Sequence, residues 1–148
     1  MDKRVLPNDV LLGEVSELLD EGRDVIIPTK GNSMLPFIKG ERDSVKLRRI
    51  EDFVVGDIAL AETRKGVYVL HRIFAIDGDI VTLMGDGNLR GREICRRGNV
   101  VGVVMSILKD DGREVDSRSP KAFRRARIWR RLLPFRRIIL GIYRRICL

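Results

Sequence analysis

The spacing of hydrophobic positions divides the chain into an opening helix, a long β-rich middle and a closing helical segment. The first apolar residues recur at helical spacing: Leu11, Leu12, Val15, Leu18 and Leu19. Asn8 or Asp9 can cap this helix at its start, and Gly22 is the expected stop after Glu21. The pattern therefore predicts a helix from about Asn8 to Glu21.

The middle of the chain consists of short apolar or alternating runs separated by turns, which is typical of β-strands. The predicted strands cover residues 44–50, 58–62, 67–76, 79–84 and 99–108, and residues 24–28 form a short apolar run that leads to the Ser33 segment. Residues 44–50 alternate imperfectly, which indicates an exposed or edge strand. Asp77-Gly78 predicts a two-residue turn that joins strands 67–76 and 79–84 into a hairpin. The predicted fold class is mainly β, with antiparallel strands after the first helix.

The composition changes at Ser119-Pro120. In residues 119–148 apolar side chains recur at helical spacing and arginines fill the intervening face. Pro134 should kink or split this helix. Residues 1–118 hold 19 Lys/Arg and 21 Asp/Glu, for a net charge of −2, while residues 119–148 hold 10 Lys/Arg and no acid. We therefore expect a domain at 1–118 and a basic amphipathic helical tail at 119–148.

The net charge of +8 therefore comes from the tail and not from the body of the chain. The body is nearly neutral, so nucleic-acid binding would have to come from the tail alone. Cys95 and Cys147 have no metal-ligand spacing, and no metal or other cofactor is expected. The N-terminus has no apolar run long enough for a signal peptide. The longest uncharged run of the tail, residues 138–143, is far shorter than the roughly 20 residues of a spanning helix.

Three residues could form a serine hydrolase site. Ser33 lies in Gly31-Asn32-Ser33-Met34-Leu35-Pro36, where glycine and proline interrupt regular structure and can present the hydroxyl outward. A serine needs a base, and His71, the one histidine, lies in a predicted strand. Asp86 follows the partner strand of the same hairpin and is the expected acid that orients His71. Taken singly, each of the three is an ordinary turn or strand residue.

Several short motifs follow one another along the chain. They are Ser33-Met34-Leu35-Pro36, Gly40-Glu41-Arg42-Asp43, Gly56-Asp57-Ile58, His71-Arg72-Ile73, Gly85-Asp86-Gly87-Asn88 and Val100-Val101-Gly102-Val103-Val104. In this order the motifs resemble the type I signal peptidase family. The resemblance covers roughly residues 25–108. The His71-Arg72 pair is similar to the histidine-type branch of archaea and the endoplasmic reticulum, whereas LexA-like self-cleaving repressors use lysine at that position.

The resemblance implies a coiled antiparallel β domain and a serine endopeptidase that works through an acyl-enzyme. Ser33 would be the nucleophile, His71 the general base and then acid, and Asp86 the residue that orients His71. The backbone N–H of Ser33 would stabilise the oxyanion, and Met34 and Leu35 would line the substrate groove. The substrate would be a precursor or leader peptide, bound in extended form. Two features depart from the family: no membrane-spanning anchor is recognised, and Gly31 stands where a serine often supports the oxyanion.

The same residues are also compatible with other functions. The chain could be a non-catalytic binding module of the same fold, or a self-cleaving regulator whose arginine tail binds DNA. For the tail we expect an interfacial helix on an anionic membrane through residues 121–148, with Phe123, Trp129 and Phe135 on its apolar face. A nucleic acid is the less favoured partner. Without an export signal, the expected location is cytoplasmic and peripheral to the membrane.

Overall fold

The computed structural model describes residues 8–147, with side chains from residue 12 onward. The side chains of Asn8 and Asp9, which were the predicted caps, and the N-terminal segment 1–7 therefore lie outside the described part. The elements are α1 (Asn8–Asp20), β1 (Val25–Pro28), β2 (Ser44–Arg48), β3 (Ile58–Arg64), β4 (Val67–Asp77), β5 (Ile80–Met84), β6 (Glu93–Arg96), η1 (Arg97–Asn99), β7 (Val100–Leu108), β8 (Glu114–Asp116), α2 (Pro120–Arg131), η2 (Leu133–Phe135) and α3 (Arg136–Cys147).

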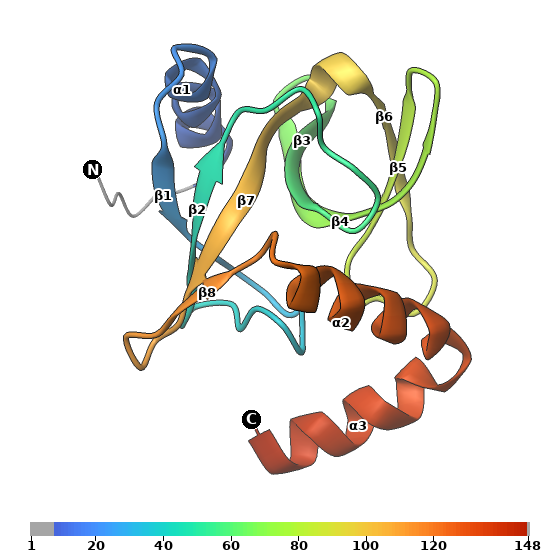
Figure 1. The fold of residues 1–148 in the computed structure, drawn as a ribbon. Coiled ribbons are helices and arrows are strands. Elements are labelled where there is room, and N and C mark those ends of the chain that lie inside the picture. The colour runs from blue at the N-terminus through green and yellow to red at the C-terminus, as the bar shows by residue number, and fades with distance from the viewer. Residues whose placement is uncertain (1–7, 148) are drawn as a thin grey trace.

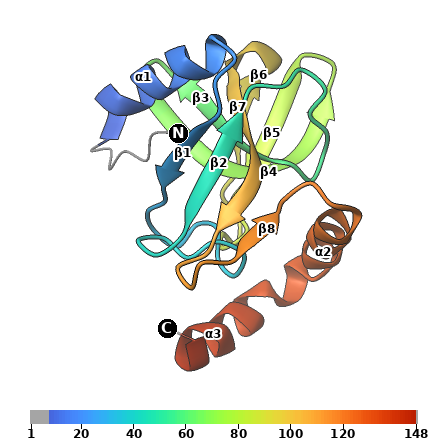
Figure 2. The same cartoon turned by 60° about the vertical axis from the view of Figure 1, so that its left-hand side comes forward.

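The strands form one curved antiparallel sheet with α1 at one end and α2 and α3 at the other (Figures 1 and 2). The strand order is β1-β2-β7-β3-β4-β5-β6, and β8 pairs with β7. The prediction of a mainly antiparallel β domain with an N-terminal helix and C-terminal helices is confirmed. Gly22 ends α1 with φ +85°, as its sequence position predicted.

Strand β2 is not an edge strand, contrary to the prediction. It lies between β1 and β7, and its Val45 and Leu47 side chains are fully buried. The charged residues of β2 led to the wrong prediction. One of them, Arg48, donates two hydrogen bonds of 2.8 Å to the Asp24 carboxylate. The strand is therefore an interior strand of the sheet, next to the edge strand β1.

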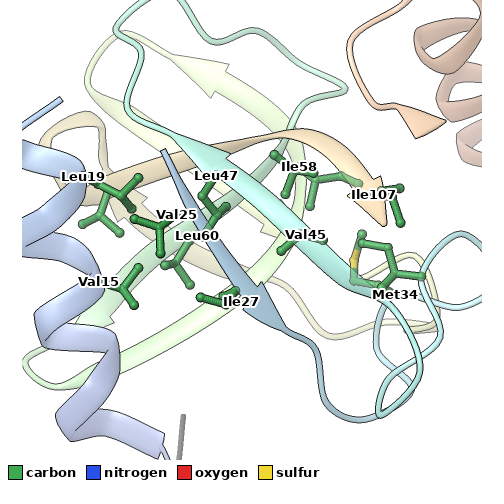
Figure 3. Close-up of a cluster of buried hydrophobic side chains, with 13 residues drawn as sticks. Val15, Leu19, Val25, Ile27, Met34, Val45, Leu47, Ile58, Leu60 and Ile107 are labelled. Carbon is green, nitrogen blue, oxygen red and sulfur yellow. The ribbon is translucent and has the colours of Figure 1, made fainter. Parts of the chain in front are cut away.

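The main core lies between α1 and one face of the sheet. Val15 and Leu19 of α1 pack toward Val25, Leu47 and Leu60, as Figure 3 shows. Each fully buried leucine stabilises the fold by about 1.5–3 kcal/mol relative to an exposed one. Met34, from the segment that carries Ser33, belongs to the same core, so the fold anchors that segment directly.

The tail packs onto the β domain rather than extending from it. Ser119 caps α2 by accepting a hydrogen bond from the Ala122 amide, and η2 separates α2 from α3 at Pro134, which confirms the predicted break. Trp129 is buried and packs with Leu35 and Leu140. The expectation that Trp129 faces outward on an interfacial helix is therefore wrong.

Candidate active site

Ser33 lies in the loop between β1 and β2, which is closed at its base by hydrogen bonds. The Thr29 hydroxyl donates to the Asp43 carbonyl over 2.7 Å, and the Glu41 amide donates to the Thr29 carbonyl over 2.8 Å. The Asp43 carboxylate accepts bonds of 2.8 Å from the Lys39 amide and from Lys109 Nζ. These bonds fix both ends of the serine loop against the sheet.

The Asp43 carboxyl is nearly fully buried, and burial by itself would raise its pKa. The hydrogen bonds from Lys109 and from the Lys39 amide outweigh burial and hold the pKa of Asp43 below its ordinary value. The carboxyl is therefore an ionised anchor for the loop at neutral pH.

A helical turn begins at Ser33. The Leu35 amide donates to the Asn32 carbonyl, and the amides of Phe37 and Ile38 donate to the Met34 carbonyl. Within the described residues, the amides of Ser33 and Met34 donate no hydrogen bond. The Gly31 amide, by contrast, is occupied by the Glu41 carboxylate. Two neighbouring N–H groups at the start of a turn suit a developing oxyanion.

The turn Gly85-Asp86-Gly87-Asn88 holds the serine loop backbone to backbone. The Gly87 amide donates to the Ser33 carbonyl over 2.7 Å. A Cβ atom on Gly85 would lie 2.4 Å from the Ser33 carbonyl oxygen, and one on Gly87 would lie 2.2 Å from that of Asn32. Only glycine allows this approach, so the two motifs are structurally interdependent.

His71 lies on β4 opposite Ala59 and is mostly buried. Ser33 and His71 line the same cavity of about 280 Å³, together with apolar residues that include Ile27, Met34 and Leu60. Their side chains, both within the described part of the chain, make no direct hydrogen bond to each other. The structure thus brings the predicted nucleophile and base to one cavity.

The acid that contacts His71 is Glu93. Its Oε1 lies 2.5 Å from His71 Nδ1. The sheet register explains the pairing: Glu93 is opposite Leu83 on β5, and Leu83 is opposite Ile73 on β4, two residues after His71. These side chains share one face of the sheet. Sequence reasoning missed Glu93 because it did not recognise β6, although the apolar Ile94-Cys95 pair after the Gly85–Asn88 turn was a signal for a strand.

Asp86 does not contact His71, contrary to the prediction. Its two carboxylate oxygens accept bonds of 3.1 and 2.6 Å from the Arg72 guanidinium. The reason is a register shift in β4 between Ile73 and Ala75, after which Arg72 is opposite Met84. Because one residue of slip moves every side chain to the other face of the sheet, Arg72 and not His71 faces Asp86.

The two predicted groove residues have different positions. Met34 lines the cavity with Ser33 and His71. Leu35 is fully buried beneath the tail helices, against Trp129, and does not line the cavity. The reason is the helical turn after Ser33, which directs successive side chains to different sides.

Tyr68 also lines this cavity. Burial and the nearby Glu62 carboxylate raise the pKa of Tyr68 above its ordinary value. Its side chain is therefore neutral at physiological pH. No cluster of three or more His, Cys, Asp or Glu residues in the described chain could hold a metal ion. The site's chemistry rests on a hydroxyl, an imidazole and a carboxylate, a combination suited to acyl transfer.

In comparisons with known proteins, no family model and no curated protein matches this chain. Across residues 8–147, no helix combines the length and apolar character needed to cross a membrane.

Proposed function

We propose that the protein is a serine endopeptidase that resembles the histidine-type signal peptidases and cleaves a precursor or leader peptide. The observation that carries this proposal is the shared cavity of Ser33 and His71, with Glu93 on the opposite ring nitrogen of His71. A carboxylate at Nδ1 favours the tautomer in which Nε2 is free to accept the serine proton.

The chemical steps follow from these positions. Nε2 of His71 takes the proton of Ser33 Oγ while Oγ bonds to the substrate carbonyl carbon, and the amides of Ser33 and Met34 receive the oxyanion. His71 then gives its proton to the leaving nitrogen as the C–N bond breaks. Water hydrolyses the resulting ester with His71 again as base. Catalytic hydrogen bonds are often loose without substrate and tighten when it binds, so direct contact between Ser33 and His71 is expected in the substrate complex.

The volume and the walls of the cavity limit which substrate side chains can bind there. About 280 Å³ with largely apolar walls fits individual side chains of a peptide, so we propose that the peptide binds extended beside β4 with an apolar residue in the cavity.

The test is digestion of a library of proteome-derived peptides by the full chain, with cleavage sites read by mass spectrometry. The proposal requires cuts made by the wild type and by Asp79→Asn, a control on an exposed residue, but not by folded Ser33→Ala. The absence of any Ser33-dependent cut would favour a non-catalytic module. Cuts confined to the chain itself would favour a self-cleaving regulator.

We also propose that α3 lies on an anionic membrane surface. Ile138, Ile142 and Ile146 of α3 continue, at helical spacing, an exposed row that begins at Phe135 of η2, and these four residues are 55–76% exposed. Residues 119–148 add ten basic residues and no acid. Ile138→Glu with Ile142→Glu should abolish sedimentation with phosphatidylglycerol vesicles. Vesicle binding that survives this change, or stronger binding to duplex DNA than to vesicles, would contradict the membrane proposal.

A further inference from the structure

A second, larger cavity lies between the sheet and α2. Its volume is about 560 Å³, and it shares no lining residue with the cavity of Ser33 and His71. Ile73, Phe74 and Met84 of the sheet form one wall, and Phe123 and Ala126 of α2 form another. The volume falls in the range of small-molecule binding sites, and these walls are apolar.

The charged groups of this cavity are unbalanced. Four arginines line it, and the one acid among the lining residues is Asp86. Arg72 already engages both oxygens of Asp86, so the charge of Arg136 has no carboxylate hydrogen-bonded to it. The cavity therefore holds an excess of positive charge next to apolar walls.

Arg136 is the most unusual of these arginines because it is 3% exposed. Its guanidinium donates to the carbonyls of Asn88, Gly85 and Trp129, over 3.0, 3.5 and 3.5 Å, and its Nε has no partner among the described residues. Burial lowers the pKa of Arg136, Asp86 opposes that shift, and Arg72 adds to it. A buried cation that contacts only neutral groups is costly, and an anion beside it would relieve that cost.

Two of the three aromatic rings that line the cavity, Phe74 and Trp129, have guanidinium groups over them. The guanidinium groups of Arg92 and Arg130 lie over the Phe74 ring, with their carbons 4.2 and 3.8 Å from its centroid. The Trp129 ring is covered by Arg136 at 5.0 Å and meets the edge of Phe37. A flexible alkyl chain needs no stacking face and can lie along the apolar walls formed by Ile73, Met84 and Ala126.

From these features we infer that the cavity binds an amphiphilic anion, with a single alkyl chain along the apolar walls and a carboxylate or phosphate head paired with Arg136. The inference depends on this cavity alone and not on the peptidase proposal. Such an anion could be a free amphiphile or could belong to a membrane lipid, and the two sources share the same head and chain chemistry.

Calorimetric titration of the full chain with sodium laurate below its critical micelle concentration tests the inference. We expect saturable binding, with at least tenfold weaker binding of uncharged dodecanol and none of acetate. Fluorescence of Trp129, the one tryptophan of the chain, should change with the same saturation curve because its ring lines the cavity. Equal affinity for laurate and dodecanol, or unsaturable uptake, would overturn the inference.

Two variants test separately how the charge of Arg136 and the volume of the cavity contribute to laurate binding. Arg136→Gln should lower laurate affinity to that of dodecanol. Because Arg136 also holds the Gly85–Asn88 turn, the second variant, Ala126→Phe, fills the cavity and leaves every charge in place. It should weaken laurate binding at least tenfold, and unchanged binding by this variant would overturn the inference.

Vesicles distinguish the two sources of the anion. If the ligand is a free amphiphile, the double change Ile138→Glu with Ile142→Glu should leave laurate binding intact while vesicle binding is lost. If it is a membrane lipid, Ala126→Phe should also weaken binding to phosphatidylglycerol vesicles. Ser33→Ala should bind laurate like the wild type whether or not the chain is a peptidase, so failure of one proposal does not imply failure of the other.

Discussion

His71 Nδ1 on β4 and Glu93 Oε1 on β6 lie 2.5 Å apart, with β5 between their strands. This contact occupies Nδ1 of the imidazole. The two acids, which the sequence does not distinguish, have different partners. Glu93 pairs with His71, and Asp86 pairs with Arg72.

Glu93→Gln should reduce kcat on a cleaved peptide by about 10²–10⁴, because an amide no longer selects the reactive tautomer or stabilises the imidazolium. The unfolding midpoint should change little, since the Glu93 side chain is partly exposed. Steady-state kinetics and urea unfolding of the same preparation measure both. An unchanged kcat would show that Glu93 takes no part in catalysis.

Asp86→Asn should act mainly on stability. It leaves the buried Arg72 guanidinium without its carboxylate, and breaking a buried pair costs about 3–5 kcal/mol. We expect a lower urea midpoint, while the fraction that stays folded keeps a larger share of wild-type kcat than Glu93→Gln does. The reverse ranking of the two variants would restore Asp86 as the residue that orients His71.

Gly87→Ala should displace the serine loop, because the added methyl would lie 2.2 Å from the Asn32 carbonyl oxygen. A matched control is Gly91→Ala in the same connection, where an added methyl meets nothing within 4 Å. We expect a loss of kcat of at least about tenfold for the first variant, since small misplacements of a nucleophile are costly. The control should stay near wild type. Equal activity of the two variants would mean that the turn does not position Ser33.

The Asp43 anchor gives the fold a defined response to acid. Because the folded pKa of Asp43 is below the ordinary value of 3.8, its stabilisation is present above that pH and is lost as pH falls through the folded pKa. Asp43→Asn should therefore lower the free energy of unfolding by about 3 kcal/mol at pH 7. The gap between wild type and variant should narrow below about pH 4. A gap that is constant between pH 7 and pH 3 in urea titrations would contradict this role.

The sequence predicted much of the fold because the determinants are local. The period of the apolar residues predicted α1, Gly22 predicted its end, and Pro134 predicted the break in the tail. The interior position of β2 could not be predicted from the sequence, because it depends on pairing with β7, which is distant in the chain, and β2 itself is rich in charge.

The candidate site was predictable only in part. Ser33 and His71 were identified from residue type together with the resemblance of the ordered motifs to a peptidase family, and they line one cavity. The pairing of Glu93 depends on the bulge near Phe74 and on the short strand β6, and neither leaves a strong local pattern. The burial of Trp129 against Leu35 was missed because helical spacing shows that a face is apolar without showing what covers it.

The central claim is that His71 can activate the group at position 33, and Ser33→Cys tests it without knowledge of the substrate. A thiol beside an imidazole ionises more readily and alkylates faster. Site-resolved iodoacetamide rates at pH 7 can be normalised to Cys147, an exposed free thiol in the same chain. We predict that adding His71→Ala slows alkylation at position 33 at least tenfold and leaves Cys147 unchanged. Equal normalised rates in the two proteins would contradict the account.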